Sequence, residues 1–135
     1  MPYITLQDLQ ERFSEHEILQ LADDGTGQVD QDEINRAIED AGGEIDGYVA
    51  GGGYAVPLSP VPNIVKSYAC DIARYRLYDD AASPQVRERY EDAIKFLRMV
   101  ARGEVKLGIG TDEDTETAGS AEFQGGSKVM PGGGF

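Results

Sequence analysis

The stretch from residue 61 to residue 80, VPNIVKSYACDIARYRLYDD, constrains the fold more than any other part of the chain. Pro62 suits the first turn of a helix, and no glycine or proline follows it within the stretch. The remaining polar strip places Asp71 one turn from Arg74. An apolar sector this wide predicts a central helix that is covered from more than one side. Its two adjacent apolar lines are Val65, Tyr68, Ala69, Ile72 and Tyr75, and Cys70, Ala73 and Leu77.

Residues that commonly cap helices mark four further helix starts. Thr5, Ser14, Asp30 and Ser83 each precede a segment with helical periodicity, and proline follows Ser83 at the first helical position. After the first three caps, an acidic residue three positions later can accept a hydrogen bond from the backbone N–H of the cap. These residues are Asp8, Glu17 and Glu33. Residues 1–103 are therefore predicted to form an all-α domain, a compact bundle of about five helices, two short and three long.

From residue 104 the pattern changes, and residues 104–135 are predicted to form an extended, glycine-rich C-terminal arm. Within it, residues 105–109 alternate between apolar side chains and polar residues or glycine, which predicts a short β-strand. A strand without a partner in a helical chain has an exposed edge, so we expect it to pair with another copy or another protein. The predicted interaction residues are Val105, Leu107, Ile109, Phe123, Val129, Met130 and Phe135; the alternative is an inert tail.

The charge of the chain is strongly negative, at -13 with a pI near 4.3. This balance argues against wrapping nucleic acid, which requires clustered Lys and Arg to neutralise phosphates. The charge is also uneven, because residues 1–50 carry thirteen acidic side chains against two basic ones, whereas residues 66–106 carry nine basic against seven acidic. Faces of opposite sign could join neighbouring copies, with Arg87 and Arg89 as inter-subunit residues. The alternative is a set of solvated helix faces.

No catalytic motif is evident in the sequence. His16 is the only histidine, and no nucleophile motif, phosphate loop, dinucleotide fingerprint or Cys/His metal cluster accompanies it. The single cysteine, Cys70, lies on the apolar side of the central helix and is predicted to be a core residue. No stretch approaches the length of a membrane span. We therefore expect a protein that is not an enzyme, carries no cofactor and does not enter a membrane.

Residues 22–33, ADDGTGQVDQDE, resemble an EF-hand calcium loop. The candidate ligands at the matching positions are Asp24, Thr26, Gln28, Asp30 and Glu33. Position 1 of such a loop is normally Asp but is Ala22 here, which removes a ligand. Asp30 and Glu33 are also accounted for as helix caps. A tight acidic turn without an ion is therefore the preferred interpretation, and a calcium-binding regulatory module is the alternative function.

Several longer segments together resemble a family of small proteins encoded among the head genes of Mu-like tailed phages and prophages. The resemblance covers roughly residues 2–103. It rests on YITLQDLQERF at the start, DDGTGQVD followed by INRAIEDAGGEIDGYV, the segment YAVPL, and VKSYACDIARYRLY in the central helix. The helical layout is also similar to that of head-tail adaptors of long-tailed phages.

The resemblance implies a structural virion protein that acts by assembly. Such adaptors form a ring, expected to be a dodecamer, beneath the portal protein in the phage neck, after assembly in the host cytoplasm. The ring would line the channel through which DNA passes without specific binding, and it would provide the docking surface for a stopper or tail-terminator protein. An acidic lining would repel the duplex and let it slide. The interaction residues of the arm would then bind the portal or a neighbouring subunit.

Overall fold

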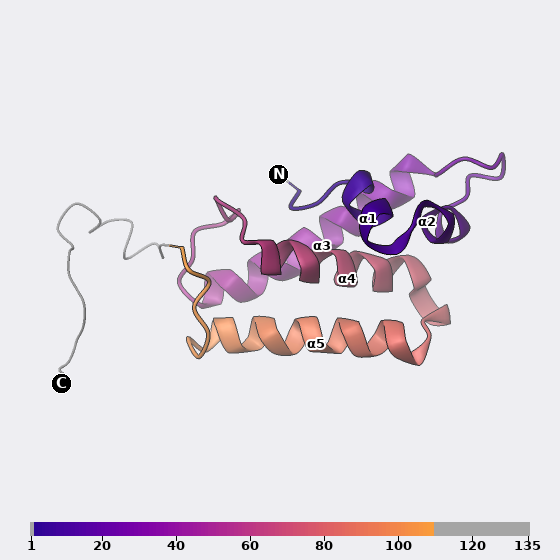
Figure 1. The fold of residues 1–135 in the computed structure, drawn as a ribbon. Helices are drawn as coiled ribbons and strands as arrows, with labels where there is room; N and C mark the ends of the chain where they lie inside the picture. Colours follow the sequence, from indigo (N-terminus) through magenta and orange to yellow (C-terminus); the bar gives the residue numbers. More distant parts are fainter. Residues whose placement is uncertain (1, 110–135) are drawn as a thin grey trace, which may run out of the picture.

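The computed structural model describes residues 2–109, and this part of the chain is a bundle of five α-helices (Figure 1). The predicted all-α fold with two short and three long helices is confirmed. Between residues 2 and 109 there is no β-strand, only an isolated antiparallel bridge between Asp23 and Val29. The elements are α1 (Leu6–Phe13), α2 (Glu15–Leu21), α3 (Gln31–Gly51), α4 (Asn63–Tyr78), the 3-10 turn η1 (Asp79–Ala81) and α5 (Pro84–Ala101).

All four predicted caps begin helices. The side chain of Thr5 accepts a hydrogen bond from the backbone N–H of Asp8, and the Asp8 carboxylate accepts one from Thr5 N, which closes the predicted capping box of α1. Ser14, Asp30 and Ser83 likewise accept backbone N–H groups in the first turns of α2, α3 and α5. Because each cap satisfies N–H groups that a helix start leaves without partners, these local patterns are reliable markers.

The predicted reciprocal bonds at the starts of α2 and α3 are wrong. Glu17 does not return to its cap, because its carboxylate crosses to Arg74 and Tyr78 on α4. At α3, the backbone N–H of Asp30 already donates to the carbonyl of Ala22 over 2.6 Å. That bond uses the backbone N–H of Asp30, from which the Glu33 carboxylate was expected to accept a hydrogen bond. In both cases a partner from outside the first helical turn replaces the local one.

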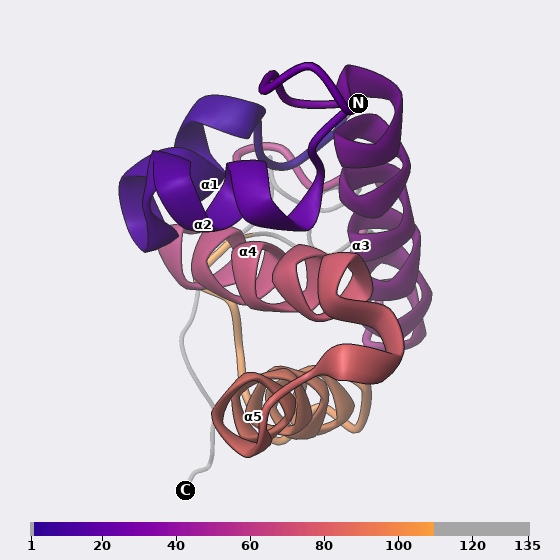
Figure 2. The ribbon, with the colours of Figure 1, turned by 90° about the vertical axis from the view of Figure 1, so that its right-hand side faces the viewer.

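Helix α4 is the centre of the bundle, as its wide apolar sector predicted. Figure 2 shows α4 with α1 and α2 on one side, α5 on the opposite side and α3 alongside, and α4 packs most extensively against α3 and α5. The core draws on all five helices, and Leu9, Ile18, Ile45, Ile72 and Leu97 are each fully buried. Burial of such side chains removes apolar surface from water and is the main force that holds these helices together.

Both ends of the described chain are fastened to the connection between α3 and α4. The hydroxyl of Tyr3 accepts a hydrogen bond from Leu58 N at 2.8 Å and donates to Asp46. Burial, followed by the Asp46 hydrogen bond, raises the pKa of Tyr3 to about 12. At the other end, Leu107 N donates to the hydroxyl of Tyr54 over 2.9 Å. Two tyrosine hydroxyls in the interior therefore hold the chain ends in place.

The predicted strand at residues 105–109 is absent from the described chain. Leu107 is only 8% exposed and belongs to the core, while Val105 and Ile109 are half-buried against it. The apolar residues of this segment therefore turn toward the protein's own helices. Alternation of apolar and polar residues over so short a segment does not show what the apolar side chains will pack against. Here they pack against the core of the same molecule.

Candidate interaction surfaces

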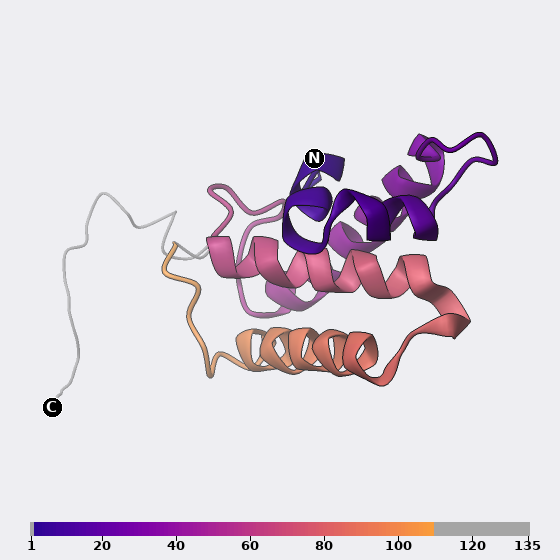
Figure 3. The same cartoon turned by 45° about the vertical axis from the view of Figure 1, so that its right-hand side comes forward.

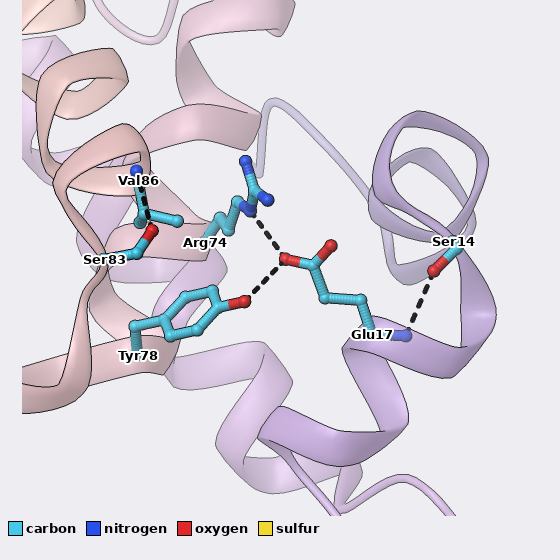
Figure 4. A network of polar contacts seen from close by, with 6 residues as sticks. All are labelled: Ser14, Glu17, Arg74, Tyr78, Ser83 and Val86. Atoms are coloured by element: carbon cyan, nitrogen blue, oxygen red, sulfur yellow. Dashed lines mark hydrogen bonds and ion pairs between the residues drawn. The ribbon is translucent and has the colours of Figure 1, made fainter.

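A polar cluster centred on Glu17 joins α2 to α4 (Figure 4). Its carboxylate oxygen Oε2 lies 2.7 Å from Arg74 Nε and accepts a hydrogen bond from the Tyr78 hydroxyl at 3.0 Å. The Arg74 guanidinium also lies 4.3 Å from the centre of the Phe13 ring, where a cation is attracted to the aromatic face. Arg74 and Glu17 are 14% and 22% exposed, so solvent screens this pair only in part. The cluster holds the α1–α2 corner against the second half of α4.

A second cluster, centred on Glu44, joins α3 to α4 and α5. Arg76 Nη2 lies 2.9 Å from Glu44 Oε1, and the Tyr90 hydroxyl donates to Glu44 Oε2 at 2.7 Å. Tyr90 also stacks on Tyr75 with ring centres 4.1 Å apart. Burial and the Glu44 hydrogen bond raise the pKa of Tyr90 to about 12, so it remains a donor near neutral pH. The role that this geometry supports is positioning of helices.

Asp71 is buried within the bundle although the sequence placed it on the polar strip of the central helix. It is 6% exposed, and its Oδ1 has no hydrogen-bond partner. Burial raises the pKa of Asp71, and the charges of Arg12, Arg89 and Arg74 act in the opposite direction. The strip is covered because α1 and α5 both pack beside α4, a long-range arrangement that helical periodicity cannot reveal.

Replacing Asp71 by Asn is expected to stabilise the protein at pH 7. The folded-state pKa lies above the ordinary value of 3.8, so the native state binds more protons than the unfolded state between these two values. The raised pKa of Asp71 therefore contributes stability that is fully present below the pKa of this group in the unfolded state. That contribution is lost as the pH rises through its pKa in the folded state. Removing the charge should raise the unfolding free energy at pH 7 by about 1 kcal/mol, the scale of a buried group without a partner.

Urea denaturation of the parent and of Asp71→Asn at pH 4 and pH 7 measures this effect. The gain should be larger at pH 7 than at pH 4. Glu91→Gln, which removes an exposed carboxylate from α5, is the matched control and should change stability by less than about 0.5 kcal/mol. A less stable Asp71→Asn protein at pH 7 would contradict the argument.

The acidic loop between α2 and α3 uses its carboxylates for its own backbone. Asp23 Oδ1 accepts hydrogen bonds from the N–H groups of Gly25 and Gly27 at 2.7 and 3.2 Å. Asp24 Oδ1 accepts from both the hydroxyl and the backbone N–H of Thr26, and these bonds lower the pKa of Asp24. Gly25 and Gly27 have φ values of +96° and +86°, which glycine adopts without strain.

The candidate calcium ligands therefore lie in a turn that is closed by protein groups. The Gln28 carbonyl accepts from Asp24 N at 2.8 Å, and Asp30 caps α3. Glu33 lies in the first turn of α3. Within residues 2–109, no three Asp, Glu, His or Cys side chains are grouped so that they could hold a metal ion. The carboxylates of Asp23 and Asp24 thus bond the backbone of the turn itself.

The predicted interaction residues have different surroundings. Arg87 and Arg89 are exposed on α5, as their positions on its charged face suggested. Leu107 is buried in this chain, and its half-buried neighbours Val105 and Ile109 lie beside it. The other four residues of the predicted set lie outside the described part of the chain: Phe123, Val129, Met130 and Phe135.

Two side chains considered for chemistry also have clear positions. Cys70 is buried, which raises the pKa of its thiol to about 12 and makes it a poor nucleophile; its predicted place in the core is confirmed. His16 is exposed on α2. In the part of the chain that the structure describes, no helix combines the length and apolar character required to cross a membrane.

The sequence did not predict a groove that is lined by three arginines. Arg12 of α1, Arg74 of α4 and Arg89 of α5 line one groove of about 380 Å³, together with Phe13, Glu17 and Gln85. The only sequence signal was the excess of basic residues between positions 66 and 106, which says nothing about Arg12. Three helices must pack before these guanidinium groups share a surface.

Comparison with known proteins identifies the family of the chain. The model of the family described as "Bacteriophage Mu, Gp36" matches residues 3–124. The "Mu-like prophage FluMu protein gp36" of Haemophilus influenzae is 42% identical over 87 residues, which cover 64% of this chain and 61% of the relative. "Gene product J" of Escherichia phage Mu is 31% identical over 124 residues, which cover 90% of this chain and 84% of that protein. The chain therefore belongs to the Bacteriophage Mu, Gp36 family of Mu-like phage proteins.

Proposed function

We propose that this protein is a structural virion protein, a head-tail connector that forms a ring beneath the portal in the phage neck. The observation that carries the proposal is membership of a Mu phage family over residues 3–124. The physical properties of the chain are compatible with it. The described part is a helical domain in which Val56 and Ile64 are the only large apolar side chains that are exposed.

The proposed ring acts by assembly and by electrostatic repulsion. Monomers bind the portal, and the C-terminal arm contacts the portal or the next subunit. Exposed carboxylates such as Glu11, Glu39 and Asp40 supply negative charge that repels the phosphates of DNA in the channel. The assembled ring, which we expect to be a dodecamer, then offers a docking surface to a stopper or tail-terminator protein. No bond is made or broken in this mechanism.

Native mass spectrometry of the protein alone and mixed with its cognate portal tests the proposal. The expected result is a monomer that forms a ring only on the portal. A protein that does not bind the portal would overturn it. Calorimetry with calcium then tests the alternative, a calcium-binding module at residues 22–33, since binding heat that disappears in Asp24→Asn would favour that function.

Reversing the two exposed charges Arg87 and Arg89 to Glu is expected to weaken ring formation. Both are exposed on α5, with Arg89 at the groove that it shares with Arg12 and Arg74, and a neighbour with an acidic surface would meet them there. The number of subunits on the portal should fall at low salt, where exposed charges are least screened. Lys95→Glu with Arg98→Glu, an equal reversal farther along α5, is the control, and unchanged assembly of the Arg87/Arg89 variant at low salt would contradict the charge model.

A further inference from the structure

The exposed apolar surface of the described chain lies at one end of the bundle. Within residues 2–109, only two large apolar side chains are exposed, Val56 at 43% and Ile64 at 46%. Val56 lies in the connection between α3 and α4, and Ile64 lies in the first turn of α4. Figure 3 shows this connection and the start of α4 at the end of the bundle where the chain leaves α5. Apolar side chains that are exposed at one end only favour a binding surface there.

The same end of the bundle carries positive charge. Lys66 lies in the first turn of α4, and Lys106 lies in the segment that is bonded to the connection between α3 and α4. Both lysines are exposed, and neither forms a salt bridge within residues 2–109. No acidic residue occurs between positions 47 and 70, and Glu104 is already paired with Arg102 at 3.1 Å. We call this surface the apolar end, and its residues are Val56, Ile64, Lys66 and Lys106.

A pocket with complementary properties lies at the opposite end of the bundle. It has a volume of about 500 Å³ and lies between α1, α2 and the loop that leads to α3. In Figure 3 this loop and the connection between α3 and α4 are at opposite ends of the molecule. Leu19 and Val29, both half-buried, give the pocket apolar surface. The other residues that line this α2–α3 pocket are Gln10, Glu15, His16, Gly27 and Gln28.

Negative charge surrounds the α2–α3 pocket. Seven carboxylates lie between positions 15 and 33, and this stretch contains no lysine or arginine that could neutralise them. Glu15 lines the pocket itself, and the antiparallel bridge places Asp23 opposite Val29. Of the seven, Glu17 alone forms a salt bridge within the described chain. The pocket therefore favours an apolar ligand that also carries positive charge.

The apolar end of a second copy is the ligand that these charges select. The apolar end and the pocket lie at opposite ends of one molecule, so they cannot meet within it. Two apolar ends that face each other would bring Lys66 and Lys106 of one copy against the same lysines of the other, and two facing pockets would bring carboxylates together. A head-to-tail contact between copies places apolar surface on apolar surface and opposite charges side by side.

We propose that the apolar end of one copy binds the α2–α3 pocket of a second copy, with Ile64 in the pocket and Lys66 and Lys106 beside its carboxylates. This inference rests on the proposed function, since it specifies a contact between neighbouring subunits of the ring. A head-to-tail contact repeats from copy to copy and closes a ring when the rotation permits. Both surfaces are small compared with those of stable dimers, so the contact forms chiefly where the portal brings copies together.

Disulfide cross-linking of the full-length chain tests the contact directly. Asn63→Cys places a thiol beside Ile64, and Gln28→Cys places one at the pocket. The two variants are mixed at low salt under oxidising conditions, alone at high concentration and on the portal. A disulfide-linked dimer of the two is expected, whereas the unmodified chain gives none because its Cys70 is buried. Glu91→Cys, exposed in the middle of α5, replaces Asn63→Cys as the control and should not cross-link.

Reversal of charge on each surface supplies the second measurement. Lys66→Glu with Lys106→Glu, in the chain that carries Asn63→Cys, should slow cross-linking about tenfold because like charges then face each other. Glu15→Lys with Asp32→Lys in the partner chain should restore most of the rate, since the two surfaces are again opposite in charge. A merely structural effect of the first reversal would not be restored by the second.

Two further variants separate the apolar contact from the total charge. Arg36→Glu with Lys95→Glu makes the same change in net charge away from the apolar end and should leave the rate within about twofold. Ile64→Ala removes a side chain that is already 46% exposed, so the fold is kept, and it should slow cross-linking about tenfold. Circular dichroism establishes that each variant is folded.

The outcomes separate this inference from the proposed function. Absence of cross-links in both conditions, or cross-linking of Asn63→Cys mainly with itself, would overturn the head-to-tail contact. A portal that shields the Asn63→Cys thiol from alkylation without any cross-link would assign the apolar end to the portal and also reject the contact between copies. A ring on the portal without cross-links would leave the connector standing and reject this contact. Cross-links between copies that never bind the portal would keep the contact and reject the connector.

Discussion

A chain that ends at Ile109 is expected to remain folded and to lose ring formation on the portal completely. Every helix and the core contact of Leu107 are retained in it, whereas the predicted interaction residues from Phe123 to Phe135 are removed. The proposed connector has then lost the arm that contacts the portal or the next subunit. Native mass spectrometry with the portal measures the loss, and thermal denaturation measures the folded state.

A shorter chain that ends at Arg102 separates assembly from stability. It also lacks Leu107, whose side chain is in the core and whose backbone N–H bonds the hydroxyl of Tyr54. Exposing apolar surface there and removing that bond should reduce the unfolding free energy by about 2–3 kcal/mol. The chain that ends at Ile109 should keep the stability of the parent. If it also keeps full ring formation, the arm has no part in assembly.

Replacing Glu17 by Ala is expected to be among the most destabilising changes of a charged residue in this protein. The change leaves the Arg74 guanidinium, which is 14% exposed, without its carboxylate, and it leaves the Tyr78 hydroxyl without its acceptor. Removing one member of a buried ion pair costs about 3–5 kcal/mol, and an exposed pair contributes about 1 or less. For this half-buried cluster we expect about 2 kcal/mol, measured by urea denaturation.

Two variants give this experiment its controls. Glu17→Gln keeps an oxygen for Tyr78 but loses the charge opposite Arg74, so it should recover part of the lost stability. Glu15→Ala removes an exposed carboxylate from the same helix and should cost less than about 0.5 kcal/mol. Equal effects of Glu17→Ala and Glu15→Ala would mean that the cluster contributes nothing.

The features that could be predicted from the sequence are those decided within one or two helical turns. Thr5 with Asp8, and the caps Ser14 and Ser83, depend on neighbours in the sequence, and the structure contains each of them. The central place of α4 followed from its wide apolar sector. These patterns specify the helices and their buried faces before any tertiary contact forms.

The features that could not be predicted depend on which elements meet. Glu17 was assigned to its own helix start but binds Arg74, which lies 57 positions away. Asp71 became buried only because two other helices cover its side of α4. Leu107 had the spacing of a strand, but the interior of the same molecule covers it. The groove of Arg12 and Arg89 combines residues from opposite ends of the helical domain.

The hydrogen bond between Leu107 and Tyr54 has a mechanical consequence for a subunit that is held by its C-terminal arm. Tension on the arm reaches Leu107 before it reaches α5, and at that point the chain is anchored to Tyr54, just after the last turn of α3. Part of the load therefore passes into the longest helix of the bundle. The C-terminal turn of α5 therefore carries less of the load, and tension on the arm does not have to unfold α5 first.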